Sequence, residues 1–251
     1  MFLQTVSDAG VRHTGAVDDT QAVTMAAAVQ SERRDYRVYK PIGTARTWAG
    51  RKTIYYSAGD EAMYAVVNRY LRAINWIQLI SWINDTAAEQ QYQFSYSTGL
   101  TITQGREINN GFSLGASYQG MSVGVEHSTR TFKNTETTST QTTAISIHVP
   151  PKSQLIFYQK RYDFEDNITF INDAWGRQWN IGPWGGYDPL TTKVTTVQIM
   201  AEEYYTRSSP LPEGPGSVHV DSVPAAETAG WNRKRENVTR RAKKQLNDMG
   251  L

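Results

Sequence analysis

The sequence predicts a mainly β fold of the α+β class, elongated, with long antiparallel strands, an amphipathic hairpin and an N-terminal region containing helices. Three observations support this prediction. From about residue 91 onward, apolar and polar residues alternate with a period of two, which is typical of strands with one covered face. Residues 128–146 are rich in Ser and β-branched Thr, without Pro or Gly. Over 63–77, by contrast, apolar residues recur at steps of three and four, a helical spacing.

Residues 1–90 are expected to form a mixed α/β head, a candidate receptor-binding region. Asp18, Asp19 and Thr20 are suited to cap a short helix over 21–31. Tyr, Val and Ile between 35 and 58 predict short strands. The clearest helix is expected over 63–77, because its apolar stripe has a polar opposite face that includes Arg69. The stripe consists of Met63, Val66, Val67, Tyr70, Leu71, Ile74 and Ile77.

Residues 91–207 are expected to form a β module. Its first strand includes Phe94 and Ile102. The Ser/Thr-rich stretch predicts two paired, solvated strands with a turn near Asn134, and low-complexity disorder is the alternative. Pro150 and Pro151 end that pair. Further strands are expected over 154–164 and 193–206, on either side of a Trp/Gly-rich loop over 172–190.

Residues 208–251 are expected to be a linker followed by a basic tail. The Pro/Gly/Ser-rich stretch 208–216 has linker composition. Residues 231–251 hold seven Lys or Arg against two acidic residues, a net +5, so the chain's +2 leaves −3 for the rest. A solvated, partly helical tail, a lipid- or nucleic-acid-binding tail and a removable pro-segment are the alternatives. Arg233, Lys234 and Arg235 form a candidate protease cleavage site.

Composition excludes several classes of protein. The chain has no cysteine, which excludes disulfides, thiol catalysis and cysteine-ligated metals. Its four histidines are scattered, so neither a metal site nor a cofactor is expected. The small net charge gives no reason to expect a nucleic-acid partner. The first residues have neither a basic nor an apolar leader region, so we expect release or secretion without a visible signal peptide.

The segment around residues 108–131 alternates most regularly. With a two-residue turn at Gln119-Gly120, its apolar side chains share one face and small polar ones the other. Arg106 and Lys133 then oppose each other where the apolar band ends, as at a lipid–water boundary. The apolar face comprises Phe112, Leu114, Ala116, Tyr118, Met121, Val123 and Val125, and the other face includes Ser113, Ser117, Ser122 and Glu126. An ordinary half-buried hairpin is the alternative.

The flanking strands are unusually long. They run from about 94 to 118 and from 121 to 145, which corresponds to roughly 80 Å of strand at about 3.3 Å per residue. Few compact domains need such a hairpin, whereas a barrel stem that reaches a membrane does.

With the Val149-Pro150-Pro151 break, residues 96–164 resemble the pore-forming module of the aerolysin-type β-pore-forming toxins. The shared pattern is an extended strand, an insertion hairpin, a Ser/Thr-rich strand pair, the break and another strand. The resemblance implies an elongated aerolysin-like fold. It also implies a soluble monomer that binds target-cell membranes, forms a homo-oligomeric ring and inserts one hairpin per protomer at the plasma membrane. The apolar face of 108–131 would contact lipid, and Ser113, Ser117, Ser122 and Glu126 would line the lumen.

Other features admit rival interpretations. The family implies a cell-surface glycan or lipid receptor, and Trp175, Trp179 and Trp184 are candidate receptor or interface aromatics, with packing on the sheet as the alternative. A non-inserting carbohydrate-binding lectin or storage protein is the second functional hypothesis. Residues 111–115 match the G-x-S-x-G motif of hydrolases but lack its strand–turn–helix context, so no enzyme is expected. Asp163, Glu165 and Asp166 favour a solvated strand end over a calcium site.

Overall fold

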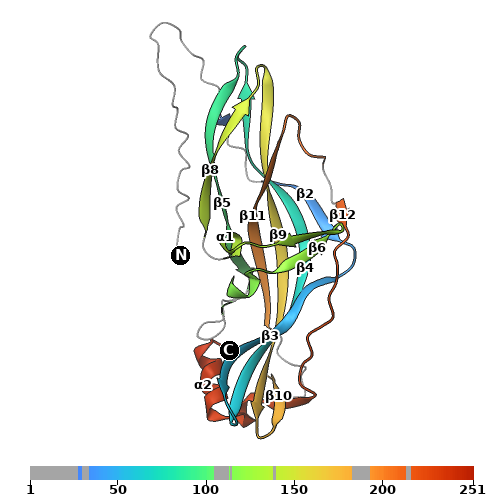
Figure 1. The fold of residues 1–251 in the computed structure, drawn as a ribbon, viewed down its shortest axis with the longest axis vertical. Helices are drawn as coiled ribbons and strands as arrows, with labels where there is room; N and C mark the ends of the chain where they lie inside the picture. Colours follow the sequence, from blue (N-terminus) through green and yellow to red (C-terminus); the bar gives the residue numbers. More distant parts are fainter. Residues whose placement is uncertain are drawn as a thin grey trace.

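The computed structural model describes residues 28–29, 34–104, 113, 115–137, 140–182, 193–212 and 216–251. The molecule is elongated, and its longest strands run along the long axis (Figure 1). An 11-stranded sheet and a separate two-stranded sheet contain the described strands. The predicted mainly β, elongated fold with long antiparallel strands is therefore confirmed.

Two strands form the centre of the large sheet. β4 (Glu61–Asn84) and β9 (Ser153–Ala174) pair antiparallel from Ala62 opposite Asp173 to Asn84 opposite Ser153. Beyond β9 follow β11 (Lys193–Arg207), β5 (Gln90–Gln104) and β8 (Gln141–Val149). Beyond β4 lie β2 (Arg34–Pro41) and β12 (Gly216–Val218). β4 alone has 24 residues, about 80 Å at 3.3 Å each.

Shorter elements decorate this sheet. β1 (Ala28–Val29) and β3 (Ala45–Ser57) pair with β4, and β10 (Arg177–Gly182) pairs with β9 and with β13 (Trp231–Lys234). β6 (Ser122–Val125) and β7 (Ser128–Thr131) form the small sheet. The described helical elements are η1 (Gly115–Tyr118), α1 (Asn134–Thr137), η2 (Arg235–Asn237) and α2 (Arg240–Asp248). No described helix is long and apolar enough to cross a bilayer.

The helix expected over 63–77 is wrong, because these residues lie in β4. β4 has partner strands on both edges, and consecutive residues such as Val66 and Val67 are buried on its two faces. The pairing with β9 shifts by one residue after Leu71, and such a β-bulge changes which residues point to which face. A bulged strand that is covered on both faces therefore produces the spacing of three and four.

Other elements that the sequence predicted also differ from those in the structure. The Ser/Thr-rich stretch does not form two mutually paired strands, since β7 pairs with β6 and β8 with β5. The expected turn near Asn134 is the short helix α1. Ala28 and Val29, from the helix expected over 21–31, form β1, and the rest of that helix lies outside the described residues. Described residues before position 91 contain strands but no helix.

The C-terminal residues pack onto the sheet. α2 begins after Thr239, whose hydroxyl caps the helix by accepting a hydrogen bond from the Ala242 nitrogen at 3.0 Å. Ala242 and Leu246 point into the same hydrophobic core as β4 and β9, together with Val238. The alternative of a wholly solvated tail is therefore wrong for the described residues, whereas the expected partly helical character is present.

Candidate functional site: the docked segment of residues 115–137

The small sheet and its flanking helices form one segment, residues 115–137, which we call the docked segment. η1 leads into β6, a tight turn joins β6 to β7, and α1 follows. Glu126 and His127 at that turn have φ angles of 50° and 64°, the left-handed backbone of a two-residue hairpin turn. The hairpin pairs Val125 with Ser128, which differs from the predicted register with its turn at Gln119-Gly120.

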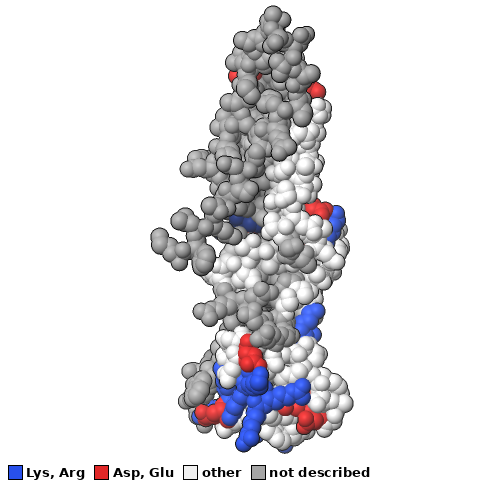
Figure 2. Space-filling view, turned by 90° about the vertical axis from the view of Figure 1, so that its left-hand side faces the viewer, with Lys and Arg blue, Asp and Glu red and all other residues white. Residues whose placement is uncertain are grey.

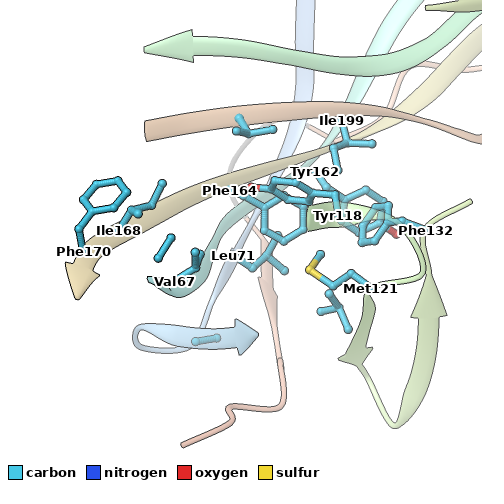
Figure 3. Packing of buried hydrophobic residues seen from close by; sticks show 14 of the residues in the cluster. Val67, Leu71, Tyr118, Met121, Phe132, Tyr162, Phe164, Ile168, Phe170 and Ile199 are labelled. Carbon is cyan, nitrogen blue, oxygen red and sulfur yellow. The ribbon is translucent and has the colours of Figure 1, made fainter. Parts of the chain in front are cut away.

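The docked segment buries its large apolar side chains against the body. Tyr118 packs against Phe164 with ring centroids 5.4 Å apart, and Phe132 packs against Tyr162 at 5.0 Å. Figure 3 shows these rings meeting the side chains of β4, β9 and β11. The buried apolar members of the segment are Tyr118, Met121, Val123 and Phe132, each exposed by 4% or less. Of the apolar face expected for 108–131, Phe112 and Leu114 lie outside the described residues.

A buried ion pair lies directly beneath Tyr118. Arg69 of β4 and Asp166 of β9 are cross-strand partners, and two hydrogen bonds of 2.7 Å join the guanidinium to the carboxylate. Both side chains are 0% exposed. Burying a charge pair costs solvation free energy that its mutual attraction recovers only with near-ideal geometry and further hydrogen bonds.

The docked segment supplies those further contacts. Arg69 donates to the carbonyl oxygen of Ser117 at 3.1 Å and to its hydroxyl at 2.7 Å. The Arg69 guanidinium lies 3.2 Å from the centroid of the Tyr118 ring, and the Tyr118 hydroxyl donates to Asp166 at 3.2 Å. Burial raises the pKa of Tyr118 well above its usual value, so the neutral phenol is the donor.

Undocking would change the surroundings of this ion pair. If the segment left, Tyr118 and Met121 would lose apolar contacts and Arg69 would lose its hydrogen bonds to Ser117, whereas Arg69 and Asp166 would regain hydration that they lack in the docked state. These effects oppose each other. Water can therefore replace part of what the ion pair would lose on release, which it could not do for a purely apolar surface of the same area.

A second ionic cluster holds the other end of the segment to β11. Arg130 pairs with Glu136 and also with Glu203, to which its Nε donates at 3.0 Å. The Tyr162 hydroxyl donates to the same Glu203 at 2.9 Å. Lys133 pairs with Glu202. Contacts from β7 and from Lys133, which precedes α1, thus converge on two adjacent carboxylates of β11.

The C-terminal residues clamp the hairpin from its outer edge. Val125 forms an isolated antiparallel bridge with Val220. Two backbone hydrogen bonds flank it, from the Glu126 nitrogen to the His219 carbonyl at 3.1 Å and from the Asp221 nitrogen to the Gly124 carbonyl at 3.0 Å. A Cβ built on Gly124 would lie 2.0 Å from an Asp221 carboxylate oxygen, so the Asp221 side chain occupies the space beside this glycine. The hairpin is therefore held between the body and the chain's own C-terminal part.

In this structure the side chains of each predicted face of 108–131 do not share one environment. Among the apolar set, Tyr118, Met121 and Val123 are buried, Val125 is half-buried and Ala116 is exposed. Among the polar set, Ser117 contacts Arg69, Ser122 hydrogen-bonds Thr131 at 2.7 Å, and Ser113 accepts from the Ala116 nitrogen at 3.2 Å. The Glu126 carboxylate accepts from the His219 nitrogen at 2.8 Å.

The remaining predicted site residues that the structure describes belong to or adjoin β10 and β13, and β10 lies at the lower end of the molecule in Figure 1. Trp175 is 59% exposed, Trp179 is half-buried, and Trp184 lies outside the described residues. Arg233 and Lys234 belong to β13 and Arg235 begins η2, so the candidate cleavage site is part of a paired strand and its continuation. Cleavage there would remove α2 but leave the clamping residues on the chain.

The acidic residues of β9 do not lie at a solvated strand end. Asp163, Glu165 and Asp166 are in the middle of β9, and each contacts a cation, namely Arg161, Arg72 and Arg69. Among the described residues no group of three or more His, Asp or Glu could hold a metal ion. Of the serine motif 111–115, positions 111, 112 and 114 lie outside the described residues.

Sequence reasoning missed the residues that hold the segment in place. Arg69 was assigned to the polar face of a helix, although an arginine within a long β-prone apolar run is itself a signal of a buried partner. Glu136, Glu202 and Glu203 give no local pattern. Glu202 and Glu203 have partners in Lys133 and Arg130, which lie 69 and 73 positions away, and Glu136 accepts from the Glu202 nitrogen 66 positions away as well as pairing locally with Arg130. Only the docking of the segment on β11 brings these distant groups together.

Comparisons with known proteins find only low similarity to this chain. No family model and no curated protein matches the chain. The structure of the oligomeric pore-forming toxin pro-Monalysin is similar with a TM-score of 0.37 and 14% identity, over 72% of this chain and 71% of that one. The structure of parasporin-2, a Bacillus thuringiensis toxin that recognizes cancer cells, is similar with a TM-score of 0.18 and 16% identity, over 65% of this chain and 77% of that one. At these values the activity has to be judged from the chain's own residues.

The β11 carboxylates make docking sensitive to acid. Hydrogen bonds from Lys133 and Thr135 lower the pKa of Glu202. Burial alone would raise the pKa of Glu203, but Lys160 and Arg130 outweigh it and lower the value. Groups with a lowered folded-state pKa stabilise the fold above their ordinary value of 4.5, and this contribution is lost as the pH falls through the lowered value.

We therefore expect the double variant Glu202→Gln/Glu203→Gln to be less stable than the wild type at neutral pH. The difference in free energy of unfolding should persist from about pH 7 to about pH 5.5 and shrink as the pH falls below 4.5 through the lowered pKa values, because the wild type then loses these charges too. Urea unfolding over a series of pH values across this range measures it. A difference that grows on acidification would contradict the assignment.

Proposed function

We propose that this chain is a pore-forming cytolysin. A soluble monomer binds the target-cell membrane, oligomerises into a ring and inserts residues of about 108–131 as a hairpin that contributes to a transmembrane β-barrel. The observation that carries the proposal is the docked segment. Its apolar side chains are buried against the body by contacts that can be exchanged for lipid and water, rather than by a core of its own.

Insertion requires three sets of contacts to break. Tyr118 and Met121 must leave Arg69 and Asp166, Arg130 must leave β11, and Val125 must separate from Val220. The β6–β7 pairing must also exchange for the longer register with its turn at Gln119-Gly120. The driving force is burial of the apolar face in lipid together with closure of every strand edge in the barrel. This activity needs no catalytic residue and no cofactor.

In the inserted state we assign the residues of 108–131 to two faces. The lipid-facing set is Phe112, Leu114, Ala116, Tyr118, Met121, Val123 and Val125, and the lumen set is Ser113, Ser117, Ser122 and Glu126. Residues 1–90 then belong to a head, 91–207 to the pore-forming module and 208–251 to a linker and tail. The Trp/Gly-rich stretch 172–190 further suggests a relation to the fungal cytolysin flammutoxin.

Release of a trapped dye from liposomes tests the proposed function. We expect release that rises steeply with protein concentration, because several protomers must assemble, and rings on the same vesicles in negative-stain images. Protein that binds the vesicles without releasing dye would contradict the proposal and favour the non-inserting lectin. Neither outcome depends on the register of the hairpin.

Two neighbouring residues test the assignment of faces. A ring of Glu126 carboxylates in the lumen favours cations, so Glu126→Lys should move the reversal potential in a salt gradient toward anion selectivity. Val125→Lys should instead reduce the number of pores, since a lipid-facing lysine costs roughly 2–4 kcal/mol near the bilayer midplane and less near its edges. Planar-bilayer recordings measure both quantities. A selectivity change in Val125→Lys but not in Glu126→Lys would invert the assignment.

A further inference from the structure

The lower end of the molecule exposes a tryptophan on a strained turn. Trp175 and Gly176 join β9 to β10 with φ angles of 55° and 70°. Asn, Asp or Gly usually occupies such left-handed positions, and a bulky residue there is unfavourable. The Trp175 side chain nevertheless is 59% exposed, so packing does not compensate for the strain. An unfavourable backbone conformation that is retained at an exposed turn indicates a functional role for the side chain, here the indole of Trp175.

Neighbouring side chains hold a row of rings and cations in place. Arg233 of β13 lies 4.4 Å from the Trp175 ring centroid and 4.1 Å from that of Trp179. Arg177 lies 5.1 Å from the ring of Trp231, which is 56% exposed. Trp179 and Trp231 are partners in the parallel pairing of β10 with β13. The two exposed indoles are therefore positioned by fixed cation–π contacts.

Further positive charge lies at the same end of the molecule. Lys234 follows Arg233 in β13, and Arg240 begins α2, and both are exposed. In Figure 2 the Lys and Arg side chains of the described surface gather at this lower end, with a few acidic residues beside them. Residues 231–251 carry seven of the chain's 26 Lys and Arg against two acidic residues. The remainder of the chain is net negative, so this end is electrostatically distinct.

We propose that this lower-end surface, comprising Trp175, Arg177, Trp231, Lys234 and Arg240, attaches the protein to an anionic lipid bilayer. Indole rings favour the membrane–water interface, and clustered cations are attracted to anionic headgroups. A sugar site would need open ring faces, whereas Arg233 already covers one face of Trp175 and of Trp179. The inference deepens the membrane binding that belongs to the proposed function and rests on it in that respect, although attachment at this end does not require the docked segment to insert.

Sedimentation of the full chain with vesicles tests the proposal. The vesicles contain phosphatidylcholine alone or with about one third phosphatidylserine. We expect binding to the anionic vesicles that weakens in high salt. Lys234→Gln/Arg240→Gln should weaken it by about fivefold for each cation removed. Trp175→Asn should weaken it about tenfold, and the fold should persist because Asn suits the turn.

Two control variants lie away from this end. Ile42→Asn removes an apolar side chain that is 71% exposed, and Lys152→Gln removes a cation at the β8–β9 turn; both should bind like the wild type. Unchanged binding of the lower-end variants, or equal binding to the two kinds of vesicle, would overturn the proposal. Vesicle binding that depends on these residues, without dye release, would support attachment at the lower end and contradict pore formation. Equal dye release by the wild type and the lower-end variants would contradict attachment at the lower end and leave the proposed pore formation standing.

Discussion

Asp166→Asn is expected to lower the free energy of unfolding by about 3–5 kcal/mol, because it leaves the Arg69 guanidinium buried without its counter-charge. The substitution preserves the shape of the side chain, so little of this loss comes from packing. The Ser117 oxygens remain as acceptors for Arg69 but carry no full charge. Urea unfolding followed by tryptophan fluorescence measures the change.

The adjacent Glu165 provides a matched control. It pairs with Arg72 on the solvent side, where the two side chains are 23% and 43% exposed. Surface pairs of this kind contribute about 0–1 kcal/mol, so Glu165→Gln should have a small effect. Equal losses in the two variants would show that the Arg69–Asp166 pair is not the buried support of the docked segment.

β5 and β11, which the sequence predicted as strands, alternate between more buried and more exposed residues along much of their length. Residues 63–77 of β4 were misassigned because the bulge after Leu71 and burial on both faces replace the period of two by a helical spacing. Its β-branched and aromatic residues, such as Val67 and Tyr70, were the signal that favoured a strand.

The candidate site could be predicted only in its apolar half. Alternation marked Tyr118, Met121 and Val123 as one apolar face, and all three are buried. The residues that hold them come from distant parts of the chain: Arg69 lies 48 positions before Ser117, and His219 lies 93 positions after Glu126. Such contacts follow from strand pairing and sheet order, which local periodicity does not encode.

A disulfide between Val125→Cys and Val220→Cys tests most directly whether the docked segment must leave the body. The flanking hydrogen bonds identify Val125 and Val220 as a non-hydrogen-bonded antiparallel pair. Cα atoms in such pairs lie about 4.5 Å apart, within the span of a disulfide. The chain has no other cysteine that could compete. The oxidised variant therefore ties β6 to the C-terminal clamp.

Dye release from liposomes is the measurement, with each single cysteine variant as a control. The oxidised double variant should bind vesicles like the wild type but release dye at least about a hundredfold more slowly, since one covalent bond blocks the rearrangement. Reductant should restore release, because cysteine is apolar enough to replace valine on a lipid-facing position. Full dye release by the oxidised variant would contradict the account, since residues 108–131 could not then be the segment that inserts.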